Sequence, residues 1–92
     1  MPLTTFHKAE NVGVRRVGEE IFILAPEGDL IVLGNETAVF LWEAVEAGAE
    51  TARDLVVRLD EGYEVSHERA ASDVDHFLGT LTARGVLLAN VK

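Results

Sequence analysis

The stretch Ile21-Phe22-Ile23-Leu24-Ala25-Pro26-Glu27-Gly28-Asp29-Leu30-Ile31-Val32-Leu33 decides the fold of this chain. Two runs of β-branched, aromatic and aliphatic residues, 21–24 and 30–33, flank a short segment that contains proline and glycine. Proline presets φ for the second position of a tight turn, and glycine supplies the left-handed residue that closes it. The stretch therefore predicts an antiparallel β-hairpin.

A further strand is predicted before this hairpin. Residues 12–17 place three valines around Arg15-Arg16, which is typical of a half-exposed strand, and Gly18-Glu19-Glu20 then turns the chain. Because both connections are tight, we expect a three-stranded antiparallel sheet with strand 30–33 at one edge.

The hydrophobic period changes from two to 3.6 after Gly34, which predicts three helices. Each helix begins at a residue whose side chain can cap its first turn and ends near a glycine. The caps are Asn35, Thr51 and Ser66, and the glycines are Gly48, Gly62 and Gly85. The apolar stripes are Ala38, Leu41, Trp42 and Val45, then Leu55, Val56 and Leu59, then Ala70, Val74, Phe77, Leu78 and Leu81. The expected order is three strands and then three helices, an α+β domain, with the apolar segment 86–88 folded back onto the core.

The composition is that of one small globular domain, with 92 residues, 48% of them hydrophobic and 26% charged. We expect this domain over residues 11–92, and a flexible tail over residues 1–10 because they show no hydrophobic period. The chain has no cysteine, which excludes disulfides and cysteine metal sites and fits a cytoplasmic protein. No apolar run approaches the roughly 20 residues that span a bilayer, and residues 1–8 lack the apolar stretch of a secretory signal.

No set of residues has the spacing of a catalytic or metal site. His67 and His76 are too far apart in sequence to share a metal as an i, i+4 pair, and the adjacent residues Ser66-His67-Glu68 cannot converge as a triad. No glycine motif for phosphate binding is present. We therefore expect no catalytic residue, cofactor or metal, and a domain that acts by binding a partner.

The formal net charge of −8 disfavours nucleic acids and anionic membranes as partners. The last two helices nevertheless resemble a helix-turn-helix pair, which leaves a winged-helix DNA-binding regulator as the alternative. Against it, the last helix offers Glu68, Asp73 and Asp75 beside Arg69 and Arg84, where a recognition helix normally carries cations and amides.

Strand 30–33 is the most informative candidate for a binding surface. It carries no lysine, proline or charge between Asp29 and Gly34, whereas edge strands are normally protected against pairing with another strand. Either the last helix covers it, or a partner peptide adds a strand there. Self-association through the same edge is a further possibility, so a monomer or a weak dimer is expected.

Several short motifs, in this order and spacing, resemble the PqqD-like peptide chaperones, which are also called RiPP recognition elements. The similar segments are Ile23-Leu24 before Pro26-Glu27-Gly28, Leu33-Gly34-Asn35-Glu36-Thr37-Ala38, Leu41-Trp42-Glu43, Ala47-Gly48 before Thr51, Leu55 and Leu59, Gly62-Tyr63-Glu64-Val65, Asp73-Val74, Phe77-Leu78, Leu81 and Arg84-Gly85-Val86-Leu87. They cover about residues 12–88.

The resemblance implies a winged helix-turn-helix-like fold that binds the leader of a ribosomally made precursor peptide and presents the peptide to a modifying enzyme, often a radical SAM enzyme. In such proteins the leader pairs with the third strand and lies between it and the third helix. Transferred to this chain, the peptide-binding residues are Asp29, Leu30, Ile31, Val32, Leu33, Ala70, Asp73, Val74, Phe77, Leu81 and Arg84. The product could be pyrroloquinoline quinone (PQQ) or another modified peptide.

Three positions depart from the family pattern. Ile31 and Val32 stand where the family often has aromatic residues, and Ala25 stands where it often has aspartate. The first difference changes the side chains that a leader would meet, but strand pairing uses backbone groups and does not depend on them.

Overall fold

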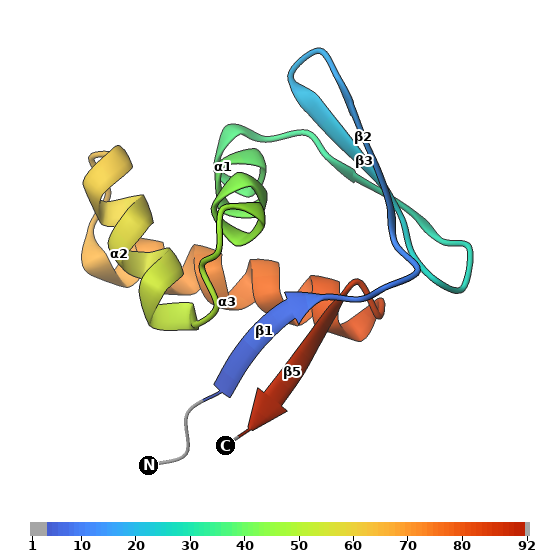
Figure 1. Cartoon of the computed structure of the whole chain (residues 1–92). Helices are drawn as coiled ribbons and strands as arrows, with labels where there is room; N and C mark the ends of the chain where they lie inside the picture. The colour runs from blue at the N-terminus through green and yellow to red at the C-terminus, as the bar shows by residue number, and fades with distance from the viewer. Residues whose placement is uncertain (1–3, 92) are drawn as a thin grey trace.

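The computed structural model describes residues 4–91, in which two small sheets pack with three helices (Figure 1). In chain order the elements are β1 (Thr4–Lys8), β2 (Gly13–Val17), β3 (Glu20–Leu24), β4 (Leu30–Leu33), α1 (Glu36–Glu46), α2 (Ala52–Gly62), α3 (His67–Ala83) and β5 (Leu87–Val91). Strands β2, β3 and β4 form an antiparallel sheet in that order, so β4 lies at an edge. The predicted α+β architecture, a three-stranded antiparallel sheet followed by three helices in a winged-helix-like arrangement, is confirmed.

The turn between β3 and β4 has the predicted chemistry. The amide of Ala25 donates to the carbonyl of Asp29 at 2.8 Å, and the amide of Gly28 donates to the carbonyl of Ala25 at 2.9 Å. Gly28 has φ of +99°, which residues with a Cβ rarely adopt. The turn therefore sets the register of the hairpin, in which Ile23 pairs with Ile31.

All three helices begin at the predicted caps. The side chain of each cap accepts a hydrogen bond from the backbone amide of the residue three positions later in the chain. The distances are 2.8 Å for Asn35, 3.1 Å for Thr51 and 3.1 Å for Ser66. Each cap satisfies an amide that has no partner within the helix.

Strand β1 corrects one expectation, since residues 4–8 were expected to belong to a flexible tail. They pair with β5, from Thr4 opposite Val91 to Lys8 opposite Leu87. Residues 1–3, the remainder of the expected tail before Thr4, lie outside the described residues. The segment 86–88 folds back as predicted at Val86 and Leu87, which are buried, but its extension into a strand was not predicted.

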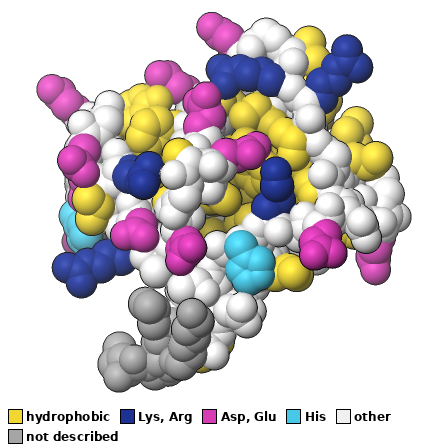
Figure 2. Space-filling model, in the orientation of Figure 1, with side chains coloured by type: hydrophobic (Ala, Val, Ile, Leu, Met, Phe, Trp, Pro, Cys, Tyr) yellow, Lys and Arg dark blue, Asp and Glu magenta, His cyan; other side chains and the backbone are white. Residues whose placement is uncertain are grey.

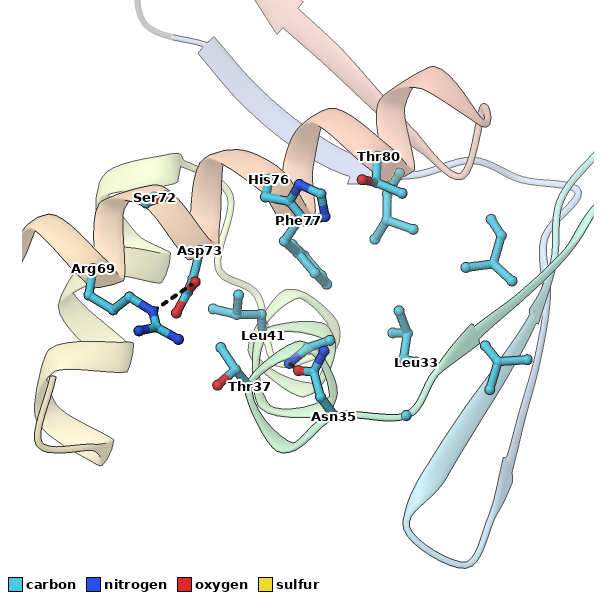
Figure 3. A pocket seen from close by; sticks show the side chains of 15 residues that line it. Leu33, Asn35, Thr37, Leu41, Arg69, Ser72, Asp73, His76, Phe77 and Thr80 are labelled. Atoms are coloured by element: carbon cyan, nitrogen blue, oxygen red, sulfur yellow. Dashed lines mark hydrogen bonds and ion pairs between the residues drawn. The ribbon is translucent and has the colours of Figure 1, made fainter.

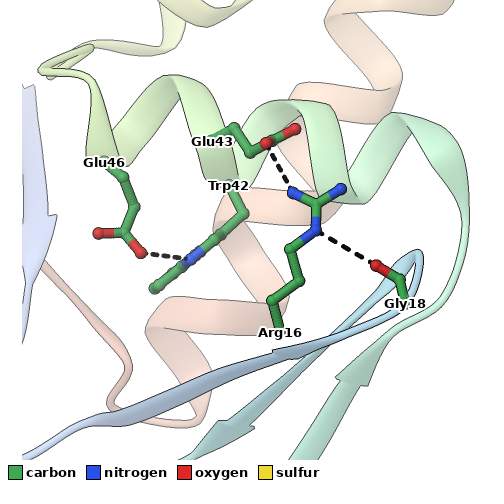
Figure 4. A network of polar contacts seen from close by, with 5 residues as sticks. All are labelled: Arg16, Gly18, Trp42, Glu43 and Glu46. Carbon is green, nitrogen blue, oxygen red and sulfur yellow. Dashed lines mark hydrogen bonds and ion pairs between the residues drawn. The ribbon is translucent and has the colours of Figure 1, made fainter.

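One hydrophobic core joins the main sheet to the helices. Its largest fully buried side chains come from β3, all three helices, the residue before β5 and the first residue of β5: Ile23, Leu41, Trp42, Leu55, Leu59, Val74, Leu81, Val86 and Leu87. The Trp42 indole N–H donates to Glu46 Oε1 at 2.8 Å, so the ring is buried while its polar atom is satisfied (Figure 4).

The hairpin β2–β3 is also tied to α1 by an ion pair. Arg16 Nη1 lies 2.7 Å from Glu43 Oε2, and Arg16 Nε donates to the carbonyl of Gly18 at 3.3 Å (Figure 4). Both charged side chains are about half exposed, so the pair orients the hairpin more than it stabilises the fold.

On the face seen in Figure 2, hydrophobic side chains gather at the centre, and charged side chains are scattered around them. Between residues 4 and 91, none of the helices combines the length and apolar character needed to cross a bilayer.

Candidate functional site

The free edge of β4 presents backbone groups without a strand partner. The Ala25–Asp29 pair is hydrogen-bonded, and hydrogen-bonded and non-bonded pairs alternate along an antiparallel ladder. Ile31 and Leu33 therefore direct their N–H and C=O groups toward β3, while Leu30 and Val32 direct theirs away from the sheet. Within residues 4–91, no backbone hydrogen bond from a loop or cap reaches Leu30 or Val32.

A groove of about 700 Å³ runs beside this edge (Figure 3). Strand β4 forms one wall, α3 forms the other, and the start of α1 with the segment before it lies between them. The lining residues are Ile31, Val32, Leu33, Gly34, Asn35, Thr37, Ala38, Leu41, Arg69, Ser72, Asp73, His76, Phe77, Thr80 and Leu81.

The groove has an apolar interior and a polar rim. Leu33, Leu41 and Phe77 project into it from three different elements, and Ser72, His76 and Thr80 follow one face of α3 along its border (Figure 3). Such a surface can bury apolar side chains of a ligand while the rim hydrogen-bonds to its backbone or polar groups.

Each end of the groove is marked by an ion pair. Arg69 Nε lies 3.4 Å from Asp73 Oδ1 within α3, toward the end where α1 begins (Figure 3). Arg84 Nη1 lies 3.6 Å from Asp29 Oδ2, which links the end of α3 to the residue before β4. Because these pairs are largely exposed, each stabilises the fold by less than about 1 kcal/mol. Their charges cancel, so the borders of the groove are close to neutral in a chain of net charge −8.

The structure brings most of the expected peptide-binding residues together. Six of them line the groove: Ile31, Val32, Leu33, Asp73, Phe77 and Leu81. Asp29 and Arg84 meet each other at its end, and Leu30 is exposed on the edge strand.

Ala70 and Val74 do not line the groove. Both are fully buried in the core, because they occupy the centre of the apolar stripe of α3 rather than its border.

The sequence interpretation missed the contribution of α1 and the polar side of α3. Asn35 was assigned to the cap and Leu41 to the core of the first helix, and Thr37 to neither, yet all three line the groove. On α3, Arg69 and His76 flank Asp73 at helical spacing, so the face next to the apolar stripe carried a usable signal.

Three of the polar side chains on α3 and at its start have structural partners. Ser66 caps α3, and His67 Nδ1 lies 3.4 Å from Asp60 Oδ2 on the exposed surface. Asp73 pairs with Arg69. Across the part of the chain that the structure describes, no three histidine or carboxylate side chains are placed to hold a metal ion.

Comparison with known proteins agrees with this geometry. Two solved structures share the fold. One is TbiB1 in complex with the TbiA(beta) leader peptide, with a TM-score of 0.79 and 20% identity over 88% of this chain and 93% of that one. The other is a lasso peptide synthetase B1 complexed with the leader peptide, with a TM-score of 0.75 and 21% identity over 90% of this chain and 96% of that one. No curated protein matches the sequence. The family model of coenzyme PQQ synthesis protein D (PqqD) matches residues 20–87, which include the main hairpin, all three helices and the whole groove. The chain therefore belongs to the PqqD family.

Proposed function

We propose that this protein binds the leader region of a ribosomally synthesised precursor peptide by strand addition to β4 and presents the peptide to a modifying enzyme. The observation that carries the proposal is the coincidence of two features at β4: free backbone groups on Leu30 and Val32, and an apolar groove beside them. Backbone pairing gives affinity for many sequences, and the groove selects among side chains.

The other edge of the sheet is less suited to strand addition. Strand β2 carries Arg15 and Arg16, whose charges oppose pairing with an unspecified strand, and Arg16 is held by Glu43. Strand β4 has only Leu30, Ile31, Val32 and Leu33. This difference supports β4 as the recognition edge.

The two structural neighbours with leader peptides support a leader as the ligand class. On this proposal the protein acts without chemistry of its own: it holds the leader while the modifying enzyme, for which a radical SAM enzyme is the expected class, acts on the rest of the precursor. The chain would work as a monomer or weak dimer in the cytoplasm, where ribosomal precursors are made, and not on nucleic acid or membranes.

A titration followed by NMR tests the proposal. The isotope-labelled protein is titrated with the leader of a precursor encoded beside its gene, and with a scrambled peptide of equal composition as the control. We expect amide shifts at Leu30–Leu33 and along the face of α3 that carries His76 and Phe77, and none with the scrambled peptide. Shifts confined to β1, α2 or β5 would show that the leader binds elsewhere.

A further inference from the structure

The face of the sheet that points away from the core is apolar at its free edge. Side chains alternate along a strand, so those of Ile31 and Leu33 face the core, while those of Leu30 and Val32 point to the opposite face, where Val32 also borders the groove. Leu30 is 62% exposed and Val32 is 46% exposed. An antiparallel sheet with one solvated face normally carries polar side chains there.

The apolar character of this outer face rises from one edge of the sheet to the other. On β2 the outward residues with side chains are Arg15 and Val17. On β3 they are Glu20, Phe22 and Leu24, and on β4 they are Leu30 and Val32 alone. Among the three strands of this sheet, β4 is thus the one whose outward residues are all apolar.

The same two residues offer the free backbone groups. In a ladder with an added antiparallel strand, Leu30 and Val32 would form the hydrogen-bonded pairs, and the partner residues opposite them would project onto the same outer face. Cross-strand neighbours of this kind have Cβ atoms about 5 Å apart and interact directly. An added strand would therefore cover Leu30 and Val32 from the side.

We propose that the protein recognises leader side chains on both faces of the added strand. Apolar side chains at leader positions i and i+2 pack on the outer face beside Leu30 and Val32, and the leader residues on either side of them in sequence enter the groove. This inference rests on the proposed function and deepens it, since it predicts a ligand with consecutive apolar residues rather than a strictly alternating pattern.

A second copy of the chain fits this face less well. Acidic side chains border it at Glu20, Glu27 and Asp29, and each copy carries a net charge of −8, so two copies would bring like charges together. A short strand that contributes apolar side chains at the edge avoids this repulsion.

The test uses a displayed library of random ten-residue peptides, selected on the intact protein and on the variant Leu30→Thr/Val32→Thr. Threonine keeps strand propensity but places a hydroxyl on the outer face. The matched control is Val17→Thr/Leu88→Thr, which changes two exposed apolar residues on strands away from the β4 edge. Circular dichroism verifies that all forms are folded.

We expect peptides selected on the unaltered protein to carry apolar residues both at the positions that face outward and at the positions between them that enter the groove. Peptides selected on the β4 variant should keep apolar residues only at the positions that enter the groove. The consensus peptide should lose about twofold to fivefold in affinity per outward position on the variant, the range of one cross-strand pair. A consensus peptide with serine at the outward positions should bind the β4 variant and the unaltered protein with equal affinity. The control variant should bind the consensus peptide with the affinity of the unaltered protein.

Two other results have distinct meanings. Peptides with strictly alternating apolar residues on both proteins would show that only one face of the added strand is recognised. That result would overturn this inference and leave strand addition intact. A selection without enrichment, or peptides whose binding survives Val32→Pro, would overturn strand addition itself and this inference with it.

Discussion

Replacing Val32 with proline removes one backbone donor from the free edge of β4. Because the Val32 amide points away from β3, the substitution keeps the ladder between β3 and β4 and should lower the free energy of unfolding by less than about 1 kcal/mol. A leader carbonyl that paired with this amide would lose its donor, which costs about 1–3 kcal/mol. The dissociation constant of the leader should therefore rise about 5- to 150-fold.

Fluorescence anisotropy with the labelled leader measures this change, and a urea titration followed by the fluorescence of Trp42 verifies stability. Val14→Pro is the matched control, because the pairing of Arg15 with Phe22 leaves the Val14 amide on the free edge of β2 by the same alternation. The control should bind the leader normally. Equal affinity of the Val32→Pro and unaltered proteins, with both folded, would refute strand addition at β4.

Three further predictions concern stability and ionisation. Trp42→Ala should lower the free energy of unfolding by about 3–5 kcal/mol in a urea titration followed by circular dichroism, since the side chain is 1% exposed; a loss below 1 kcal/mol would contradict its place in the core. Gly79→Ala should raise the free energy of unfolding by about 0.4–1 kcal/mol, because Gly79 lies within α3 and a new Cβ there would meet open space. Gly28→Ala should lower the free energy of unfolding by about 1 kcal/mol or more, because Gly28 has a positive φ. The opposite order of melting temperatures would refute both assignments. Desolvation, the hydrogen bond to Glu36 at 3.2 Å and nearby carboxylate charge raise the pKa of Tyr63 above its ordinary value. Glu36→Gln should therefore lower that pKa in an absorbance titration of this single tyrosine. An unchanged titration curve would contradict the contact between Tyr63 and Glu36.

Local signals predicted the main sheet and the helices because each boundary depends on chemistry within a few residues. The Pro26–Gly28 turn and the Asn35 cap each satisfy hydrogen bonds locally, so their sequence is sufficient evidence. Strand β1 gave no such signal. Thr4–Lys8 contains one large apolar residue, Phe6, and it becomes a strand only by pairing with residues at the far end of the chain.

The candidate site was predictable to the extent that it follows strand and helix periodicity. The uncharged β4 indicated an unprotected strand edge, whereas the groove between this edge and α3, with Phe77 in it, was expected only from the family resemblance. Periodicity could not separate Val74, at the centre of the stripe, from Phe77, at its border, because both are apolar at helical spacing. It also could not show that Leu41 reaches the groove, since that depends on how α1 crosses between β4 and α3.

The pairing of β1 with β5 brings the two ends of the domain to one place, with Thr4 opposite Val91. None of the residues of either strand lines the groove. A polypeptide joined to either end would thus leave from the same point without crossing the groove. The domain could therefore be fused through a short linker to the start or the end of an enzyme, or inserted into a loop of the enzyme. Tethering of this kind would turn delivery of a bound precursor into an encounter within one molecule and raise its effective concentration at the enzyme.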